Sequence, residues 1–411
     1  MPPLILYDDH VARGFEPFAL TRPVSELRAG AQLIRRRWER ALGLRAEGFV
    51  AGAHLAEFDD PGTPPAATGV LPTGTVVANA RAVVAIARVD AGADVWTCGG
   101  RVAAVRLREP LPVDRLADGA LELGALAAGD SARRVETGGR WIDAVWDLVG
   151  QLDVQLKEDI PALAAMLDCV PHDGTVLGTG AVYVERGATI EPFVVLDTTS
   201  GPILVRDGAT VQSFTRIIGP CYIGEGSTVV ADRISGCSIG HVCKIHGEIS
   251  ATIVLGHSNK GHDGFVGHSY LGRWVNLGAG TTTSNLKNTY GHVALWTPAG
   301  VRDTGLQFLG TLFGDHAKTG IGLRLTTGTV LGAGSNVWDG MPPKVTPPFA
   351  WGGGAPYDAY DVEKFIQVTE RAMARRHVTL SDRSRAQLRA AARVASEGCA
   401  AGRYAPNGGR S

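Results

Sequence analysis

Histidines are unevenly spaced along this chain, and their spacing is the first indication of chemistry. Six of the eleven fall between positions 241 and 292, and the densest polar stretch is 256–288. A neutral imidazole near pH 7 can take a proton from an ammonium or hydroxyl nucleophile. In the same stretch, Lys260 could hold a phosphate, and Asn276 and Asn285 could hold an amide or a sugar hydroxyl. The segment therefore predicts transfer of a group onto a polar substrate.

Metal binding is the competing interpretation of these histidines. His257, His262 and His268 are separated by five and six residues. On a coil with three faces, these spacings place successive side chains on different faces, which disfavours a shared ion. A purely structural role for any one of the histidines stays open as well.

The element that must position these side chains is a six-residue repeat. The 54 glycines concentrate after position 172, and aliphatic or β-branched residues recur there at steps of six. This period fits neither an α-helix nor a single strand, and it is shorter than the 8–12-residue turn spacing of a β-sandwich. It is typical of a three-sided coil, in which the repeated residue points inward and glycine allows a tight corner. The repeated residues are Val184, Ile190, Leu196, Val205, Val211, Ile217, Ile223, Val229, Ile234, Ile239, Ile245, Leu271, Leu277, Phe313, Thr319, Leu325, Leu331 and Val337.

The period predicts a left-handed parallel β-helix, made of hexapeptide repeats, over residues 172–341. At roughly 18 residues per coil, about nine coils are expected. Two segments break the period: 197–204 is a polar loop, and 284–304 leaves the register after Thr283. Because excursions from a regular solenoid tend to carry its binding groups, both segments are candidate parts of a site.

The sequences that flank the repeat predict two further parts. Residues 1–165 are expected to form a mixed α/β domain, and residues 342–411 a Pro-rich linker followed by C-terminal α-helices. Adjacent arginines at 35–37 and 375–376 are interpreted as solvated helix faces. The expected strands are 4–7, 75–78, 95–98 and 102–107, the last two joined by a Gly99-Gly100 turn, and the expected helices are 31–42, 141–156, 357–377 and 381–396, the last with Ser381 as N-cap.

The composition argues against several classes of protein. A net charge of −1 disfavours a nucleic-acid binder, which needs a surplus of Lys and Arg. The six cysteines lack zinc spacing and are expected to be buried in a reducing compartment. The N-terminus has no signal-peptide pattern, and no run reaches the ~18 apolar residues of a membrane span. We therefore expect a cytoplasmic protein without nucleic-acid or membrane partners.

The stretch GHDGFVGHSYLGRWVNLGAGT (261–281) resembles the acetyltransferase half of the bifunctional enzyme family that makes UDP-N-acetylglucosamine. In that family, a Gly-His pair opens this segment and Asn-(Ile/Leu)-Gly-Ala-Gly-Thr ends it. The resemblance implies that His262 is the catalytic base, that Asn276 binds the sugar phosphate and that Ala279 contacts acetyl-CoA. It also implies that Asn285 lies at the wall of the active site and that the protein is a homotrimer.

This chain departs from the family pattern at several positions. Phe265 replaces a tyrosine of the family, and Leu286 replaces the tyrosine after Asn285. The family's arginine and lysine on earlier coils have only Arg216 and Lys244 in the corresponding region. Lys260 and Lys287 are then the cations available to the acyl acceptor, alongside Phe265, Asn276 and Asn285.

Residues 15–41 are similar to the first loop and helix of sugar-1-phosphate nucleotidyltransferases, in which Arg, Pro and Gly precede an amphipathic helix. That loop holds a nucleoside triphosphate with backbone N–H groups and a basic side chain. Here the usual Gly-rich run is absent, and Val24 stands where a lysine is expected. The available basic side chains are Arg13, Arg22 and Arg28, and the carboxylates nearest to a catalytic Mg²⁺ are Asp8 and Asp9.

Three functions are consistent with these patterns. The preferred one is acyl transfer from acetyl-CoA to a sugar phosphate in the β-helix, with His262 as general base and a nucleotidyltransferase-like N-terminal domain. The second is synthesis of a nucleotide sugar and pyrophosphate by the N-terminal domain with Mg²⁺, beside a structural β-helix. The third is a non-catalytic trimeric scaffold that senses a nucleotide or nucleotide sugar.

Overall fold

The computed structural model describes residues 2–127, 129 and 132–404. The chain divides into two compact units, the first made of residues 1–145 and 381–394 and the second of residues 146–380 and 395–411. Helix α5 (Asp382–Ala400) therefore begins in the first unit and ends in the second. The predicted N-cap of this helix is confirmed, because the Ser381 hydroxyl accepts the backbone N–H of Ser384 at 3.1 Å.

A six-stranded sheet with the order β11-β8-β9-β6-β1-β4 is the centre of the first unit. Strand β1 (Leu4–Tyr7) lies parallel to both of its neighbours, and its four apolar residues are buried, as the sequence predicts. The predicted hairpin of β8 and β9 is also confirmed, with Gly99 and Gly100 both at positive φ. The other elements of this sheet and its helix are β4 (Ala46–Val50), β6 (Val76–Asn79), β8 (Val95–Cys98), β9 (Arg101–Arg106), β11 (Arg134–Glu136) and α1 (Ile34–Leu42). Three two-stranded pairs complete the unit: β2 (Arg28–Ala29) with β3 (Gln32–Leu33), β5 (Val70–Leu71) with β10 (Leu111–Pro112), and β7 (Ala82–Val84) with β12 (Gly139–Trp141).

Helix α1 corrects the interpretation of residues 35–37 as a solvated face. Arg35 and Arg37 are buried, and only Arg36 is exposed. Arg35 forms an ion pair with Glu26, and Arg37 donates hydrogen bonds to backbone carbonyls. Arginine can lie in this interior because each guanidinium finds acceptors there.

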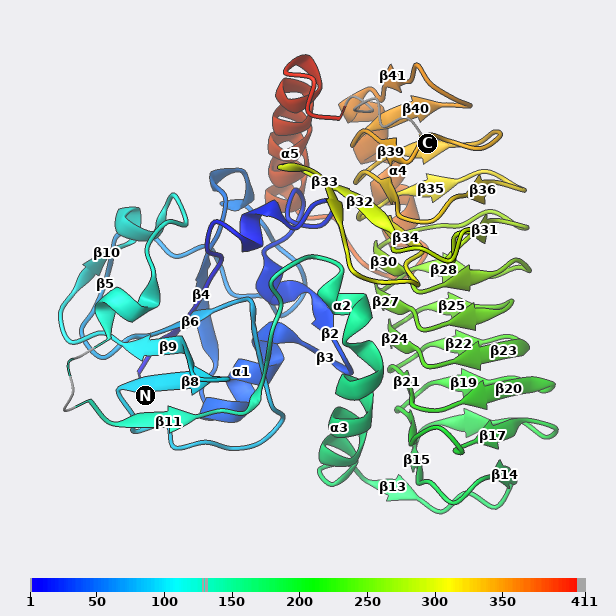
Figure 1. The fold of residues 1–411 in the computed structure, drawn as a ribbon, viewed down its shortest axis with the longest axis horizontal. Coiled ribbons are helices and arrows are strands. Elements are labelled where there is room, and N and C mark those ends of the chain that lie inside the picture. The colour runs from blue at the N-terminus through cyan, green and yellow to red at the C-terminus, as the bar shows by residue number, and fades with distance from the viewer. Residues whose placement is uncertain (1, 128, 130–131, 405–411) are drawn as a thin grey trace. The chain divides into compact units, whose positions relative to one another are not determined.

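The second unit is a three-sided left-handed β-helix, whose short strands stack coil upon coil (Figure 1). One side is a ten-stranded sheet: β13 (Cys169–Val170), which is antiparallel, then β15 (Val182–Glu185), β18 (Ile203–Val205), β21 (Cys221–Ile223), β24 (Ser238–His241), β27 (Ile253–Gly256), β30 (Tyr270–Arg273), β34 (Thr311–Phe313), β37 (Thr329–Leu331) and β39 (Val345–Thr346). The second side contains β14 (Thr175–Leu177), β17 (Val195–Asp197), β20 (Thr215–Ile218), β23 (Asp232–Ser235), β26 (Ile249–Ser250) and β29 (Val266–Gly267). The third side contains β16 (Thr189–Ile190), β19 (Thr210–Val211), β22 (Thr228–Val229), β25 (Lys244–Ile245) and β28 (Asn259–Lys260), and later coils add β35 (Lys318–Thr319), β38 (Asn336–Val337), β40 (Ala350–Gly352) and the antiparallel β41 (Asp358–Ala359).

The interior of the coils is filled by the residues of the six-step repeat. Leu196, Ile223 and Leu331, for example, are fully buried in one continuous apolar cluster. Pairing partners are 18 residues apart between Val205 and Ile223, but only 15 apart between Ile239 and Val254. Shortened coils of this kind explain why the period slips in the middle of the repeat.

The predicted excursion after Thr283 is confirmed as an insertion in one coil. It follows β31 (Thr282–Thr283), which pairs with β36 (Arg324–Leu325), and it contains the hairpin of β32 (Ala294–Thr297) and β33 (Gly300–Asp303). Helices α2 (Asp147–Gly150) and α3 (Leu152–Ala164) precede the coils, and α4 (Val362–Ala374) follows them. Within the described part of the chain, no helix has both the length and the apolar character needed to cross a membrane.

Candidate active site

A line of polar side chains crosses four neighbouring coils on the third side of the β-helix. The strand register aligns Lys244 with Asn259, Asn259 with Asn276, and Asn276 with Lys318. The Asn259 amide donates to the Asn276 side-chain oxygen at 2.9 Å. Because side chains alternate along a strand, the next residue of each coil points inward and this line points outward. We call these four residues the polar ladder.

The polar ladder forms one wall of a cavity of about 460 Å³. His262 lies on the turn that follows β28; it is exposed and faces this cavity. The structure therefore brings together two of the predicted site residues, His262 and Asn276. The lining residues are Lys244, His257, Asn259, Gly261, His262, Trp274, Val275, Asn276, Lys318, Ala372, Arg375 and Arg376.

Lys260 does not lie in this cavity, and the prediction that it holds a phosphate is wrong. The register places it in line with Ile245, so its side chain points into the coil, where it is 1% exposed. Its ammonium donates to the backbone carbonyls of His246, His262 and Asp263. Burial lowers the pKa of Lys260 to about 8, against the opposing effect of nearby carboxylates. From inside the coil, the Lys260 ammonium therefore holds in place the turn that carries His262.

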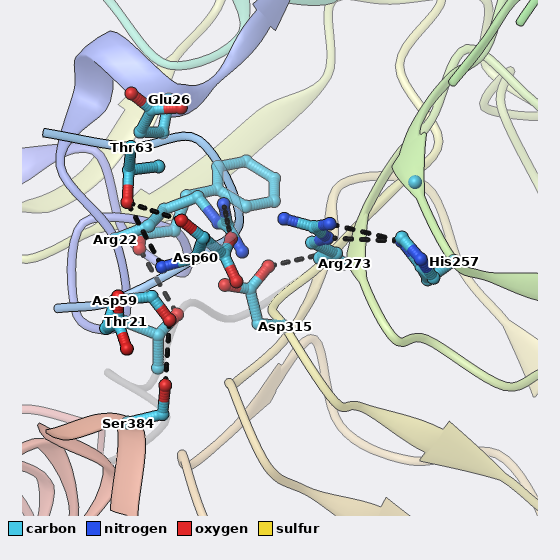
Figure 2. Close-up of polar contacts among 12 residues, drawn as sticks. Thr21, Arg22, Glu26, Asp59, Asp60, Thr63, His257, Arg273, Asp315 and Ser384 are labelled. Carbon is cyan, nitrogen blue, oxygen red and sulfur yellow. Dashed lines mark hydrogen bonds and ion pairs between the residues drawn. The ribbon is translucent and has the colours of Figure 1, made fainter. Parts of the chain in front are cut away.

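Two imidazoles beside the cavity are held by one guanidinium. Arg273 donates to Nδ1 of His257 at 3.2 Å and lies 3.1 Å from Nε2 of His241 (Figure 2 shows Arg273 with His257). Its backbone N–H is bound in turn by the buried carboxylate of Asp315 at 2.7 Å. Of these two histidines, His257 lines the cavity.

Rings stack at the corner next to the cavity, and helix α4 packs on them. His257 and Trp274 lie on successive coils with ring centroids 4.3 Å apart, and Trp274 stacks on His316 of the following coil. Phe365 of α4 contacts His316 edge-on at 5.7 Å and is fully buried. The side chain of Asp361 caps the start of the helix. This packing fixes α4 on the β-helix.

The C-terminal end of α4 reaches the cavity, which sequence reasoning missed. Arg375 and Arg376 were interpreted as a solvated helix face, but both line the cavity. Arg375 is exposed, and half-buried Arg376 donates to the backbone carbonyl of Val242 at 3.3 Å. No local signal marks them, because they follow His262 by more than a hundred residues.

Ala279 lies on the next coil at the position equivalent to His262, because Asn259 and Asn276 are aligned. In its turn, the N–H groups of Gly278, Gly280 and Thr281 donate to backbone carbonyls. The Ala279 N–H has no partner among the described residues. One backbone donor is thus available near His262.

Phe265 lies on the same turn as His262, between β28 and β29, whereas Asn285 follows β31 and lies at a different corner of the coil. The Asn285 amide contacts Nδ1 of His268 at 2.8 Å, and His268 stacks on Phe308. Burial lowers the pKa of His268, so its ring is neutral near pH 7. His268 and Phe308 line a second cavity of about 500 Å³ beside α2 and α3. Lys287 follows Asn285 and faces neither cavity.

The residues of the first unit that were predicted to bind nucleotide already form hydrogen bonds or ion pairs within the protein. Arg13 donates to the carbonyls of Asp8, Leu116 and Ala117, and Arg28 donates to that of Ala31 at 2.6 Å. Buried Arg22 forms an ion pair with Asp60 at 3.2 Å (Figure 2). Each of the three guanidinium groups thus has contacts within the protein, and Arg22 already has a carboxylate partner in Asp60.

The two carboxylates predicted to bind Mg²⁺ are also bound within the protein. Asp9 forms an ion pair with Arg81 at 2.7 Å and accepts hydrogen bonds from Asn79 and the Ala12 N–H. Asp8 accepts the Val24 N–H at 2.9 Å, and burial raises its pKa to about 7. Among the described residues, no group of three or more His, Cys, Asp or Glu is arranged to hold a metal ion. The structure does not bear out a Mg²⁺ site at Asp8 and Asp9.

The chain thus combines an α/β unit with a left-handed β-helix that carries His262 at a polar cavity. Comparison with known proteins gives the particular resemblance. Residues 4–166 match a family model described as sugar nucleotidyl transferase. The chain is similar to the bifunctional protein GlmU of Methanococcus vannielii, at 28% identity over 204 residues, which are 49% of this chain and 44% of that protein.

Two other relatives agree with this resemblance. The bifunctional sugar-1-phosphate nucleotidylyltransferase/acetyltransferase of Sulfurisphaera tokodaii is 28% identical over 152 residues, 34% of this chain and 36% of that protein. The bifunctional protein GlmU of a Jannaschia species is 30% identical over 114 residues, 27% of this chain and 24% of that protein. The chain spans less than half the length of each of these relatives.

One solved structure that matches is a mutant of AntD, an N-acyltransferase from Bacillus cereus, in complex with dTDP and coenzyme A. It is 12% identical, with a TM-score of 0.20, and the match covers 51% of this chain and all of that one. A TM-score this low does not support a shared fold.

Proposed function

We propose that the β-helix transfers an acetyl group from acetyl-CoA to an amino or hydroxyl group of a sugar phosphate. The observation that carries this proposal is the position of His262, exposed at a cavity that Asn276 and four cations also line. The relatives named as bifunctional nucleotidylyltransferase/acetyltransferase support the same reaction class.

The reaction begins when His262 takes a proton from the nucleophile of the acceptor as that atom attacks the thioester carbonyl. The Ala279 N–H is placed on the equivalent turn of the next coil to donate to the developing oxyanion. Collapse of the intermediate breaks the C–S bond, and the thiolate of coenzyme A takes the proton back from His262. Asn259 and Asn276 hold polar groups of the acceptor.

We also propose that the active protein is a homotrimer, as the resemblance implies. Asn285 lies at a different corner of the coil from His262, so it would complete the cavity of a neighbouring copy. Mixing His262→Ala and Asn285→Ala proteins under conditions that exchange subunits should then restore activity. A mixture as inactive as its parts would contradict this arrangement.

A second activity, nucleotidyl transfer in the first unit, is favoured by one observation, the family match over residues 4–166. Asp8, Asp9 and Arg22 already form hydrogen bonds or ion pairs within the protein. These contacts weigh against the nucleotide-binding and Mg²⁺-binding roles predicted for them. The activity would therefore need other side chains, or a rearrangement when nucleotide and Mg²⁺ bind.

The two activities are separated by assaying the whole protein for thiol release and pyrophosphate release in parallel. Thiol release is measured with acetyl-CoA and a panel of amino sugar phosphates, and pyrophosphate release with nucleoside triphosphates, sugar 1-phosphates and Mg²⁺. We expect acceptor-dependent thiol release. Pyrophosphate release without thiol release from any acceptor would contradict the main proposal.

A further inference from the structure

The inward-facing positions on the third side of the β-helix form one column of side chains. The strand register stacks Val229, Ile245 and Lys260 on successive coils. The whole column contains Ile190, Val211, Val229, Ile245, Lys260, Leu277, Thr319 and Val337. Lys260 and Thr319 are its polar members. An aliphatic side chain would fill the apolar interior at either position, and a buried ammonium costs free energy unless its donors are used. Packing alone therefore does not explain these two residues.

The turn that carries His262 is longer than the turn of the coil before it. Residues 246–248 connect β25 to β26, whereas residues 261–265 connect β28 to β29. The longer turn brings additional backbone carbonyls to the interior, and these need hydrogen-bond donors. The Lys260 ammonium donates to the carbonyls of His262 and Asp263, and also to that of His246 in the turn before. One inward side chain thus holds both turns.

The contacts of Lys260 also link His262 to the turn of Ala279. The carbonyl of Asp263 accepts a hydrogen bond from the Lys260 ammonium at 2.6 Å and another from the Gly280 N–H at 3.3 Å. The backbone beside His262 is thereby joined to the backbone beside Ala279. The distance between the imidazole and the Ala279 N–H therefore depends on the ammonium.

Thr319 holds the turn of Ala279 from the following coil. Its inward hydroxyl accepts the Gly278 N–H at 3.0 Å and lies 2.8 Å from the hydroxyl of Thr281. Gly278 and Thr281 lie on either side of Ala279. The two polar members of the column thus contact the two turns that contribute to the proposed reaction, one turn each.

The contacts of Lys260 depend on its charge. An ammonium donates three hydrogen bonds, one for each of the three carbonyls, whereas a neutral amine has two N–H groups and a lone pair that repels the third. Burial lowers the pKa of Lys260 to about 8, while the nearby carboxylates of Asp263 and Asp232 oppose this effect. The imidazoles on the contacted turns are those of His246, which faces Asp232, and His262.

We propose that Lys260 is a positioning residue for acyl transfer, whose buried ammonium holds His262 in place relative to the Ala279 N–H, and that transfer slows when this ammonium loses its proton. The inference rests on the proposed function, in which His262 is the base and the Ala279 N–H stabilises the oxyanion. Lys260 itself points into the coil, away from the substrates. It acts through the geometry of two turns, and the rate of transfer is sensitive to that geometry.

Lys260→Met tests this inference, because methionine suits an inward position but lacks the donors. The matched control is Ile245→Met, at the same position of the coil before. kcat and KM for thiol release are measured across pH with the fastest acceptor of the amino sugar phosphate panel. At pH ~7, Lys260→Met should lower kcat roughly 10–100-fold with KM nearly unchanged, as expected when a reacting group is displaced.

The pH profile separates positioning from a purely structural role. The ratio of the wild-type kcat to that of Lys260→Met should fall as the pH rises above about 8, because the wild type then loses the ammonium as well. Ile245→Met should follow the wild type at every pH. Asp232→Asn removes a carboxylate that raises the pKa of Lys260 and lies outside the cavity, so it should move the fall in rate to lower pH.

Amide hydrogen exchange of residues 261–265 gives a reading that does not require turnover. At pH ~7, exchange should be faster in Lys260→Met than in Ile245→Met. The difference should shrink above pH ~8, because Ile245→Met keeps Lys260 and loses its proton there. Comparing the two variants at one pH cancels the intrinsic pH dependence of exchange.

A kcat of Lys260→Met within about twofold of the wild type, or the same pH profile in both proteins, would overturn the inference while acyl transfer itself stands. If Lys260→Met does not fold, a fall in the wild-type rate that Asp232→Asn leaves at the same pH overturns it instead. Faster exchange of residues 261–265 in Lys260→Met, without thiol release by the wild type from any acceptor, would refute the proposed function and leave the effect of Lys260 on the turn standing.

Discussion

At the end of β1, Asp9 is held by Arg81 and Asn79, whereas beside β28 the cations Lys244 and Lys318 face a cavity that no described carboxylate enters. Both regions were predicted from sequence to perform chemistry, because each combines charged side chains with a turn. The first has its charges matched within the protein, as structural ion pairs are. The second leaves its charges unmatched, as a site does when the partner is a ligand.

The largest expected effect concerns His262. If the unmatched cavity is the active site, His262→Ala should reduce acyl transfer by ~10²–10⁴-fold, the range for loss of a general base. The rate of thiol release measures it. His292→Ala, an exposed histidine outside the cavity, is the control and should keep the wild-type rate. Equal rates in all three proteins would remove the distinction between the two regions.

The ion pair at the end of β1 should matter for stability instead of activity. Arg81→Met leaves the carboxylate of Asp9 buried without its partner, so we expect the free energy of unfolding to fall by about 3–5 kcal/mol. Chemical denaturation of the purified protein measures it. A loss below about 1 kcal/mol would mean that the charges at the end of β1 are not interdependent.

The pH dependence of stability tests the buried ammonium of Lys260. Its pKa is about 8 in the folded protein, below the 10.5 of a free lysine. The unfolded chain therefore binds more protons between these values, and this group makes stability rise as the pH increases from about 8 to 10.5. Over that window, the unfolding free energy of the wild type should rise by about 1–3 kcal/mol relative to that of Lys260→Met. A difference that stays constant with pH would contradict the buried position.

The smallest effect is expected for Lys318→Met. Removing an unmatched half-buried charge should leave the unfolding free energy unchanged or raise it by up to about 1 kcal/mol, while weakening binding of glucosamine 1-phosphate. Denaturation midpoints and calorimetry on the same samples give both values. A clear loss of stability would show that the charge is matched after all.

Much of the fold could be predicted because the six-residue period is a local signal. Each inward position, from Leu196 to Val337, is set by the alternation of side chains within a short strand. The same period did not reveal the position of Lys260, since shortened coils shift the register between Ile239 and Val254. Pairing with Ile245 shows that Lys260 occupies an inward position.

The candidate site was only partly predictable for a different reason. His262, Asn276 and Ala279 lie on adjacent coils of one repeat, so a short motif contains them. Arg375 and Arg376 reach the cavity only because Phe365 packs α4 on the ring of His316. Such a tertiary contact leaves no pattern in the sequence of either partner.

The most direct test of the account is a crystal structure of the protein with coenzyme A and glucosamine 1-phosphate. We expect the sugar phosphate to lie in the cavity beside His262, with its amino group within ~2.6–3.2 Å of a ring nitrogen of His262. A sugar phosphate bound at the end of β1, with the cavity beside His262 empty, would contradict it.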